Sequence, residues 1–290
     1  MPRRASREVA PTASVGRAGK LSLEYVRQGD RTVFGRTSCR TPWHLFPPIY
    51  LDDTGSAYTL LVNPSGGLVG GDHLSIDLSI GPKAHALISS PSANRVYRSL
   101  SKDAVQEVHI TVEPGGILEW VPEHTIPFAG SRFLQTIGVK LATGATLILW
   151  DAIASGRIAR GERWKCATLE NQIRITTASG AAVSEHYALT DDDTESRIGL
   201  AEAWNYVGSL FVIGDAVDNT TWTSLDNTLA GILETQSEQV LGGVSQPAVP
   251  GLVVKLVAKT APALTAVLNE LWAAVRQALW KLPPAILRKY

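Results

Sequence analysis

The most constraining feature of this chain is a glycine-rich loop at residues 63–72, which runs directly into an alternating pattern at residues 73–80. Glycine adopts positive φ angles and lets two backbones approach closely, so a loop with four glycines has a demanding geometry. Phosphate-binding glycine loops open a helix, whereas alternation with a period of two is typical of a strand. The loop is therefore predicted to shape a β structure and to position Asp72, and not to hold a nucleotide.

Composition limits the class of protein. With 290 residues, 44% of them hydrophobic, the chain is long enough to bury the core of one large all-β domain or two smaller ones. The 27 basic and 27 acidic residues balance, so no net field attracts nucleic acid or an anionic membrane. No apolar run reaches the roughly 18 residues of a membrane-spanning helix. We therefore expect a cytoplasmic protein with no nucleic-acid or membrane partner.

The first 20 residues and the two cysteines bear on the cellular compartment. Residues 1–20 carry four arginines among small residues, and no apolar segment follows them, which does not fit a secretory signal. A disordered basic tail is predicted, with an organelle transit peptide as the alternative. Cys39 and Cys166 are far apart in the sequence. Reduced thiols are favoured, and a disulfide between the two is the alternative.

Short strand patterns separated by turn residues fill the chain as far as residue 213. They are expected at residues 21–26, 57–62, 73–80, 84–88, 105–112, 117–120, 133–141, 146–150, 170–176 and 210–213. The separators Gly81-Pro82, Pro114-Gly115-Gly116 and Thr143-Gly144 have typical turn composition. No long helical pattern interrupts the strands, which argues against βαβ units and favours stacked antiparallel sheets.

Helical patterns are found only in the last third of the chain. Ser224 is predicted to cap one helix, a strand is expected at residues 251–259, and Thr260 is predicted to cap a second helix. The apolar stripe of the second helix, which ends in Trp272 and Trp280, is predicted to pack on the protein's own sheet, with a docking face as the alternative. A single domain is thus predicted over residues 21–290, β-rich to residue 215 and mixed with helices over 216–290.

The sequence offers no compact catalytic or metal-binding motif. Its six histidines are dispersed, and it lacks His-Glu-x-x-His, Cys-x-x-Cys and Gly-x-Ser-x-Gly. Two other classes of function stay open. One is a β-rich hydrolase whose catalytic groups come together only in the fold. The other is an iron–sulfur assembly scaffold of the SufB/SufD kind, which would need Cys39 or Cys166.

Four blocks of the sequence resemble, in order, the signature segments of the urease accessory protein UreD family, called UreH in some bacteria. The blocks are the glycine loop at 63–72, residues 89–99, residues 118–132, and the Gly-Arg-x-x-x-Gly-Glu pattern that begins at Gly156. The motif residues they supply are Gly66, Gly67, Gly70, Gly71, Tyr97, Arg98, Gly156 and Arg157. Departures include His73 in place of a frequent arginine and Asp151 in place of a frequent glutamate.

The resemblance implies both a fold and a role. The fold is mainly β, with stacked sheets in a β-helix-like arrangement and about two α-helices near the C-terminus. The role is that of a non-enzymatic chaperone that binds the urease apoprotein and UreF, and through UreF the GTPase UreG. The resemblance further implies that Ni²⁺ passes to the urease active site through an internal, water-filled tunnel. It implies no tightly bound cofactor, only nickel in transit.

A conduit for nickel must not trap its ion. Clusters of cysteine and histidine would bind Ni²⁺ tightly, whereas scattered carboxylates with water would hold it weakly. We hypothesise that Asp72 is a transient nickel contact, and a turn bond that closes the glycine loop is the alternative. Three glutamates are lesser candidates, because each could instead pair with Arg98, Arg132 or Arg157. They are Glu119, Glu123 and Glu162.

Partner surfaces follow from the same resemblance. The C-terminal helix with Trp272 and Trp280 is predicted to contact UreF, because UreF is helical and would pack against another helix. The strand-rich N-terminal half would then face urease.

Overall fold

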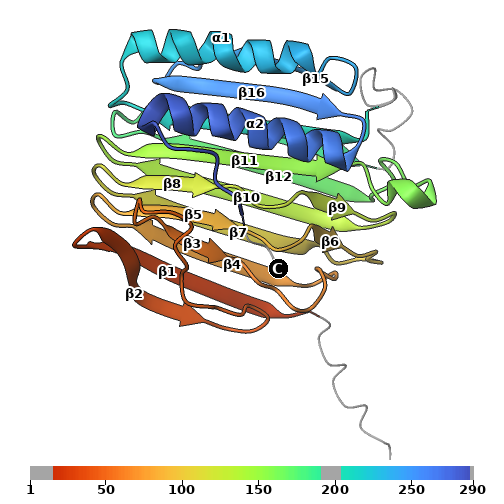
Figure 1. Ribbon diagram of the computed structural model, residues 1–290. Coiled ribbons are helices and arrows are strands. Elements are labelled where there is room, and N and C mark those ends of the chain that lie inside the picture. The colour runs from red at the N-terminus through yellow and green to blue at the C-terminus, as the bar shows by residue number, and fades with distance from the viewer. Residues whose placement is uncertain (1–15, 191–203, 288–290) are drawn as a thin grey trace, which may run out of the picture.

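The computed structural model describes residues 16–190 and 204–287, and two β-sheets that lie face to face form its centre (Figure 1). Two helices pack on the outer face of one sheet, so the molecule has three layers. Most of the predicted basic tail falls outside the described residues. The first strand begins at Ala18, so the prediction that the tail extends to Lys20 is wrong for residues 18–20.

One sheet has seven strands. Their order is β13 (Ala182–Thr190), β12 (Thr168–Thr176), β10 (Arg132–Leu141), β7 (Ala104–Val112), β4 (His73–Ile80), β1 (Ala18–Gln28) and β2 (Arg31–Cys39). The five central strands, from β12 to β1, are parallel to one another. The two edge strands, β13 and β2, pair with them in antiparallel fashion.

The other sheet has nine strands. Along its main path the order is β15 (Val240–Ser245), β16 (Gly251–Ala258), β14 (Tyr206–Gly214), β11 (Thr146–Ala154), β8 (Ile117–Trp120), β5 (His85–Ser89) and β3 (Ala57–Leu60). Strands β11, β8, β5 and β3 are parallel, and the other three follow in antiparallel fashion. The short strands β6 (Asn94–Val96) and β9 (Thr125–Pro127) pair with each other beside β11.

The chain winds as a solenoid, because successive central strands alternate between the two sheets. The predicted turns Gly81-Pro82, Pro114-Gly115-Gly116 and Thr143-Gly144 each connect a strand of the seven-stranded sheet to one of the nine-stranded sheet. The turns also bond to one another, since the amide of Lys83 donates to the carbonyl of Pro114 at 3.2 Å. The β-helix-like arrangement of stacked sheets with two helices near the C-terminus is confirmed.

The expected antiparallel pairing is wrong for the five central strands of the seven-stranded sheet and for β11, β8, β5 and β3, whereas it is correct for β11, β14, β16 and β15. Parallel strands need a crossover connection, which is usually a helix. Here the crossover is a strand of the opposite sheet, so parallel pairing requires no helical pattern in the sequence. The sequence prediction also misses five strands, namely β2, β6, β9, β13 and β15.

Apolar side chains fill the space between the sheets. Strand β4 buries every second residue, which is the alternation seen in its sequence. All nine residues of β11 are buried, because one face of this strand meets the seven-stranded sheet and the other meets the helices. One core thus lies between the two sheets, and the other lies between the nine-stranded sheet and the helices. Burial of apolar surface is the dominant favourable term in folding, so these two cores hold the three layers together.

The helices are α1 (Asn219–Thr235) and α2 (Ala261–Trp280). Thr260 caps α2 through its side chain and Pro262 lies in the first turn, as predicted. Helix α1 begins earlier than predicted, with Asp218 as its cap, because Trp222 extends the buried stripe one turn before Leu225. No helix within the described ranges combines the length and the apolar character that crossing a bilayer requires.

Candidate functional site

A row of polar side chains crosses the inner face of the seven-stranded sheet. Gln106, Gln135, Asn171 and Tyr187 are register partners on the neighbouring strands β7, β10, β12 and β13. Gln106 Nε2 donates to Gln135 Oε1 at 3.0 Å, and Gln135 Nε2 donates to Asn171 Oδ1 at 2.9 Å. Asn171 Nδ2 in turn donates to the Tyr187 hydroxyl at 3.1 Å. The row interrupts an otherwise apolar core, since the inward positions beside Gln135 and Asn171 are apolar.

Asp151 on β11 faces this row from the opposite sheet. Its Oδ1 accepts a hydrogen bond from Gln135 Nε2 at 3.0 Å, and its Oδ2 accepts one from Asn171 Nδ2 at 2.9 Å. The residue is only 8% exposed. Burial raises the pKa of the Asp151 carboxyl, while the two amide donors and the charge of Lys255 oppose that rise. A nearly dry carboxylate is therefore held by neutral partners.

The polar row continues to the end of the molecule where β13 and β15 form the sheet edges. Ser209 on β14 and Lys255 on β16 follow Asp151 in register across the nine-stranded sheet. The Ser209 hydroxyl donates to Glu185 on β13 at 3.0 Å, and Lys255 forms an ion pair with the same carboxylate. Half of the Lys255 side chain is exposed, so the polar row reaches solvent at this end.

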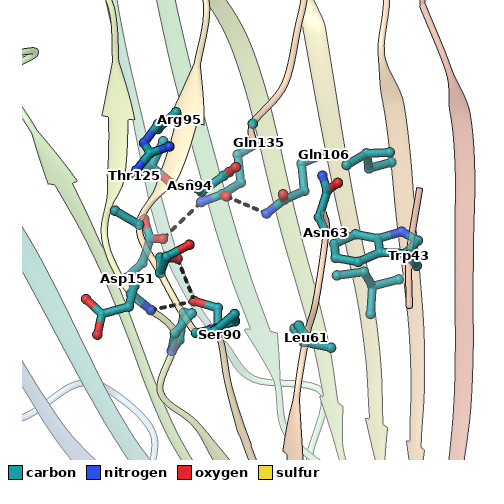
Figure 2. Close-up of a pocket in the computed structure, with 18 of the residues that line it drawn as sticks. Trp43, Leu61, Asn63, Ser90, Asn94, Arg95, Gln106, Thr125, Gln135 and Asp151 are labelled. Carbon is teal, nitrogen blue, oxygen red and sulfur yellow. Dashed lines mark hydrogen bonds between the residues drawn. The ribbon is translucent and has the colours of Figure 1, made fainter. Parts of the chain in front are cut away.

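A cavity of about 110 Å³ lies on the other side of Asp151 (Figure 2). Gln106, Gln135 and Asp151 form its polar inner wall, and Figure 2 shows the hydrogen bond that joins the two glutamines. The rest of the cavity is lined by the loop residues Gly66, Gly67 and Ser90, by Asn94 and Arg95 of β6, and by apolar side chains. A polar cavity of this size has room for several water molecules.

The sequence prediction does not include this polar row. A polar residue at an inward position of an alternating strand was the available signal, as with Gln135 between Phe133 and Ile137. Four such residues become a site only when the register aligns them. The sequence identified Asp151 solely as a departure from the family pattern.

Asp72 is buried at the end of the glycine loop. Its Oδ1 accepts a hydrogen bond from the amide of Arg17, and its Oδ2 accepts one from the amide of Val69, both at 2.9 Å. The bond to Val69 closes the glycine loop, and the bond to Arg17 ties the loop to the start of β1. Both carboxylate oxygens thus have backbone donors, which is the geometry of the turn-closing alternative.

The glycines of this loop allow unusually close approaches. A Cβ atom on Gly67 would lie 2.3 Å from a backbone oxygen, and one on Gly70 would lie 2.0 Å from Ser99 Oγ. Gly66 and Gly71 adopt positive φ angles of 79° and 94°. The loop therefore packs against the Tyr97-Arg98-Ser99 segment in a way that a side chain would prevent.

The four sequence blocks meet at one corner of the solenoid. The Tyr97 hydroxyl donates to the carbonyl of Gly66 at 3.1 Å. The amide of Ser99 donates to the carbonyl of Gly130 at 3.0 Å. The amide of Ala129 donates to Glu162 at 3.2 Å. An open groove runs over this corner, and we call it the corner groove. It is lined by Tyr97, Arg98, Phe128, Ala129, Gly130, Arg157 and Glu162.

Glu162 and Arg157 form the ion pair that the sequence allowed as an alternative to nickel binding. Arg157 Nε donates to Glu162 Oε2 at 2.7 Å, and a second bond joins Arg157 Nη2 to Glu162 Oε1. These bonds hold the pKa of the Glu162 carboxyl below its ordinary value. Gly156, with φ of 143°, turns the chain so that its neighbour Arg157 reaches Glu162. Glu123, by contrast, lines the cavity, and its backbone amide donates to Ser90 Oγ at 2.9 Å.

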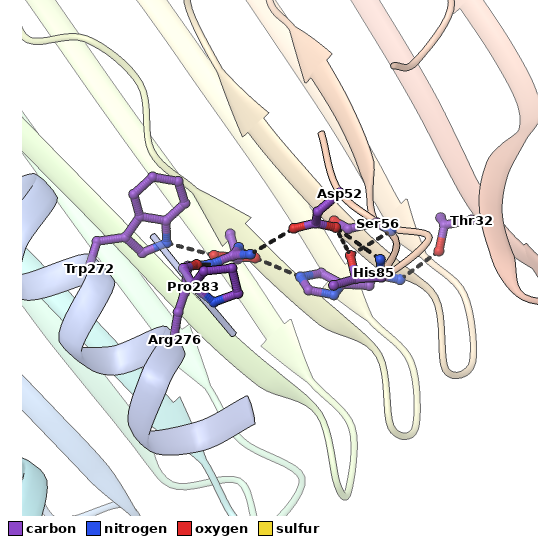
Figure 3. Close-up of polar contacts among 9 residues, drawn as sticks. Thr32, Asp52, Ser56, His85, Trp272, Arg276 and Pro283 are labelled. Atoms are coloured by element: carbon purple, nitrogen blue, oxygen red, sulfur yellow. Dashed lines mark hydrogen bonds and ion pairs between the residues drawn. The ribbon is translucent and has the colours of Figure 1, made fainter. Parts of the chain in front are cut away.

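Glu119 on β8 is fully buried and links the nine-stranded sheet to α2. Its partners Trp272 and Arg276 on the helix and His85 on β5 are labelled in Figure 3. Its Oε1 lies 2.6 Å from His85 Nε2 and 2.5 Å from Arg276 Nη1, and its Oε2 accepts a hydrogen bond from Trp272 Nε1 at 2.6 Å. The suggested pairing of Glu119 with Arg98, Arg132 or Arg157 is wrong, because the cation that reaches this strand comes from α2.

The two tryptophans predicted to contact a partner differ in position. Trp272 is 1% exposed and stacks edge-to-face against Trp150, with ring centroids 5.9 Å apart. Its indole belongs to the core between α2 and the sheet, so the predicted partner contact must be corrected for this residue. Trp280, at the end of α2, is partly exposed and packs beside the ring of His85.

Within the described ranges, no three histidine, cysteine, aspartate or glutamate side chains gather as a metal site. Cys39 is exposed and Cys166 is buried, and neither forms a disulfide. The metal-binding potential of the described residues therefore lies in separate carboxylates and amides, among them Asp151, a buried carboxylate that lines the internal cavity.

Comparison with known proteins gives one consistent result. The model of the UreD urease accessory protein family matches residues 17–289. A urease accessory protein UreD from Haloarcula marismortui is 30% identical over 288 residues, which cover 98% of this chain and 95% of the relative. One from Delftia acidovorans is 30% identical over 93% of this chain and 92% of its own length. The family is named for an accessory protein and not for an enzyme. The chain belongs to the UreD urease accessory protein family.

Proposed function

We propose that this protein is a cytoplasmic chaperone of urease maturation that bridges the urease apoprotein and UreF, and through UreF reaches UreG. In this proposal Ni²⁺ travels between the two sheets, along the polar row, on its way to the urease active site. The single observation that carries the proposal is the buried Asp151 carboxylate, which lies between a polar cavity and a polar row that leads to solvent.

The chemistry of the row suits brief contact with a divalent cation. A carboxylate in a dry core, held by neutral amides, attracts positive charge strongly because the local dielectric is low. Oxygen ligands nevertheless bind Ni²⁺ less tightly than clusters of imidazole and thiolate do. Asp151 with the amide oxygens of Gln135 and Asn171 would therefore hold nickel and release it, as a conduit requires.

Other carboxylates fit the route less well than Asp151. Glu123 lines the cavity and is the best placed of the glutamates. Glu119 and Glu162 are engaged by arginines, and both oxygens of Asp72 accept backbone hydrogen bonds. At those positions nickel would have to displace an arginine or a backbone amide, whereas at Asp151 it would displace only the side-chain amides of Gln135 and Asn171, so we place the principal contact at Asp151.

The test is the substitution Asp151→Asn in the full chain, co-expressed with the urease apoprotein, UreF and UreG. The change keeps the shape of the side chain and removes its charge. Urease activation should fall by about tenfold or more, the effect of losing roughly 1.4 kcal/mol of interaction with the ion. Binding to the apoprotein and to UreF, measured by co-purification, should persist.

Asp77→Asn is the matched control, because Asp77 on β4 is partly exposed and pairs with Lys20 on the outer face of the same solenoid. It should activate urease at the wild-type level. Normal activation by Asp151→Asn would refute the route through the polar row. Normal urease maturation in cells that lack the whole protein would refute the proposed function itself.

A further inference from the structure

We infer that the corner groove binds an acidic segment of a partner protein, and that this segment also carries an apolar side chain. The inference rests on the proposed function, since the partner is taken to be a protein of the urease maturation complex. It adds the place and the chemistry of the contact, which neither the polar row nor the family match supplies.

The first step is the rigid floor of the groove. The Arg157 guanidinium lies 4.3 Å from the centre of the Phe128 ring, and Tyr97 meets Phe128 edge-to-face at 5.1 Å. The ion pair with Glu162 fixes the orientation of the Arg157 guanidinium. Side chains that are already ordered lose little entropy when a partner binds, so this stack is a prepared contact surface.

The second step is the charge above that floor. Arg98 lines the groove, and Arg95, two residues before Tyr97, lines the adjoining internal cavity; both are exposed, and no ion pair within the described ranges joins a carboxylate to either of them. Glu162 and Asp103, the acidic groups nearby, are already paired with Arg157 and Arg132. The groove thus presents positive charge without compensation, which favours a negatively charged partner.

The third step is an apolar rim beside the arginines. Leu100 is 91% exposed, and Val69 on the glycine loop is 40% exposed. The close packing of Gly70 against Ser99 brings the two segments that carry them together. Exposed aliphatic side chains next to arginine and aromatic groups are typical of protein interfaces, which explains why the segment should carry an apolar residue.

The groove also borders the internal cavity. Gly66, Gly67 and Arg95 line that cavity, and Gly66 accepts the hydrogen bond of Tyr97. A partner that docks on the corner groove would lie beside the cavity, at one end of the polar row. Docking and the passage of nickel would then share one location.

Arg98→Glu in the full chain tests the charge. The affinity of the purified variant for the urease apoprotein and for UreF is measured at low and at high salt. We expect a loss of about tenfold or more for one of these partners, with a weaker dependence on salt than in the wild type. Arg98→Lys should retain most of the affinity. Lys140→Glu is the matched control, since Lys140 is exposed on the outer face near the other end of β10.

A photo-crosslinking residue in place of Leu100 identifies the occupant. The crosslinked peptide of the partner, sequenced by mass spectrometry, should be rich in aspartate and glutamate. Wild-type affinity of Arg98→Glu for both partners, a crosslink to a peptide without acidic residues, or Arg98-dependent retention of nucleic acid would each overturn the inference. If Arg98→Glu binds normally while Asp151→Asn still blocks activation, only the docking surface fails and the proposed function stands.

Discussion

Glu119 gives the sharpest test of how α2 is attached to the solenoid. Its carboxylate is completely buried and accepts hydrogen bonds from Arg276 and Trp272 on the helix, while His85 approaches from the neighbouring strand. The substitution Glu119→Leu leaves the Arg276 guanidinium, which is 1% exposed, facing Asp52 at 3.4 Å and the carbonyl of Pro283 at 3.2 Å. Removing one partner of a buried ion pair destabilises a protein by about 3–5 kcal/mol.

Equilibrium unfolding in urea, followed by tryptophan fluorescence, measures this change. Adding Arg276→Met to Glu119→Leu should restore roughly 1–3 kcal/mol of the lost free energy of unfolding, because it removes a buried charge that only the longer contact with Asp52 still compensates. Recovery stays incomplete, since the indole of Trp272 still loses its acceptor. The exposed pair of Lys20 and Asp77 is the control, and Asp77→Leu should cost less than about 1 kcal/mol.

The same cluster predicts a dependence on pH. Burial acts to raise the pKa of the Glu119 carboxyl, but His85 and Arg276 outweigh it and hold the pKa below its ordinary value of 4.5. A depressed pKa contributes stability that is present above the unfolded value and is lost as the pH falls through the folded value. The difference between wild type and Glu119→Leu should therefore shrink on acidification below about pH 4.5. A cost under about 1 kcal/mol at neutral pH, or a second substitution that deepens the loss, would refute this account of the cluster.

Two further predictions concern the glycine loop. Gly70→Ala places a methyl group 2.0 Å from Ser99 Oγ and should lower the free energy of unfolding by about 1–3 kcal/mol. Gly243→Ala, whose added methyl group would have no atom within 4 Å, should change the free energy of unfolding little. The midpoints of urea unfolding compare the two variants. Asp72→Ala removes the acceptor of two backbone amides and should cost roughly 2–4 kcal/mol, whereas wild-type stability with lost urease activation would instead support a nickel contact at Asp72.

Local patterns in the sequence were enough to predict many of the elements. Alternation located β4, turn residues located the stacked turns of the solenoid, and Thr260 with Pro262 located the start of α2. Each of these features depends on residues within a few positions of one another, and a short window of sequence contains them. The cap of α1 was misplaced because Trp222, one turn before Leu225, already belongs to its buried stripe.

The candidate site could not be predicted in the same way. Gln106, Gln135 and Asn171 lie on separate strands, and only parallel pairing in this register aligns them as one row. Asp151 joins them because the chain returns in the opposite sheet at the same level. A single polar residue in a strand does not reveal which distant strand will lie beside it.

Strand alternation, turn positions and the start of the last helix follow from local sequence, because they depend on backbone preferences and on the periodicity of neighbouring side chains. Family membership can also be predicted from the sequence, through the four signature segments that occur in order. Three features instead depend on the fold: the parallel pairing at the centre of the seven-stranded sheet, the neutralisation of Glu119 by a cation far along the chain, and the buried carboxylate that faces a row of amides. Those outcomes depend on which segments become neighbours when the two sheets and the helices pack together, and that is settled by the burial of the whole core.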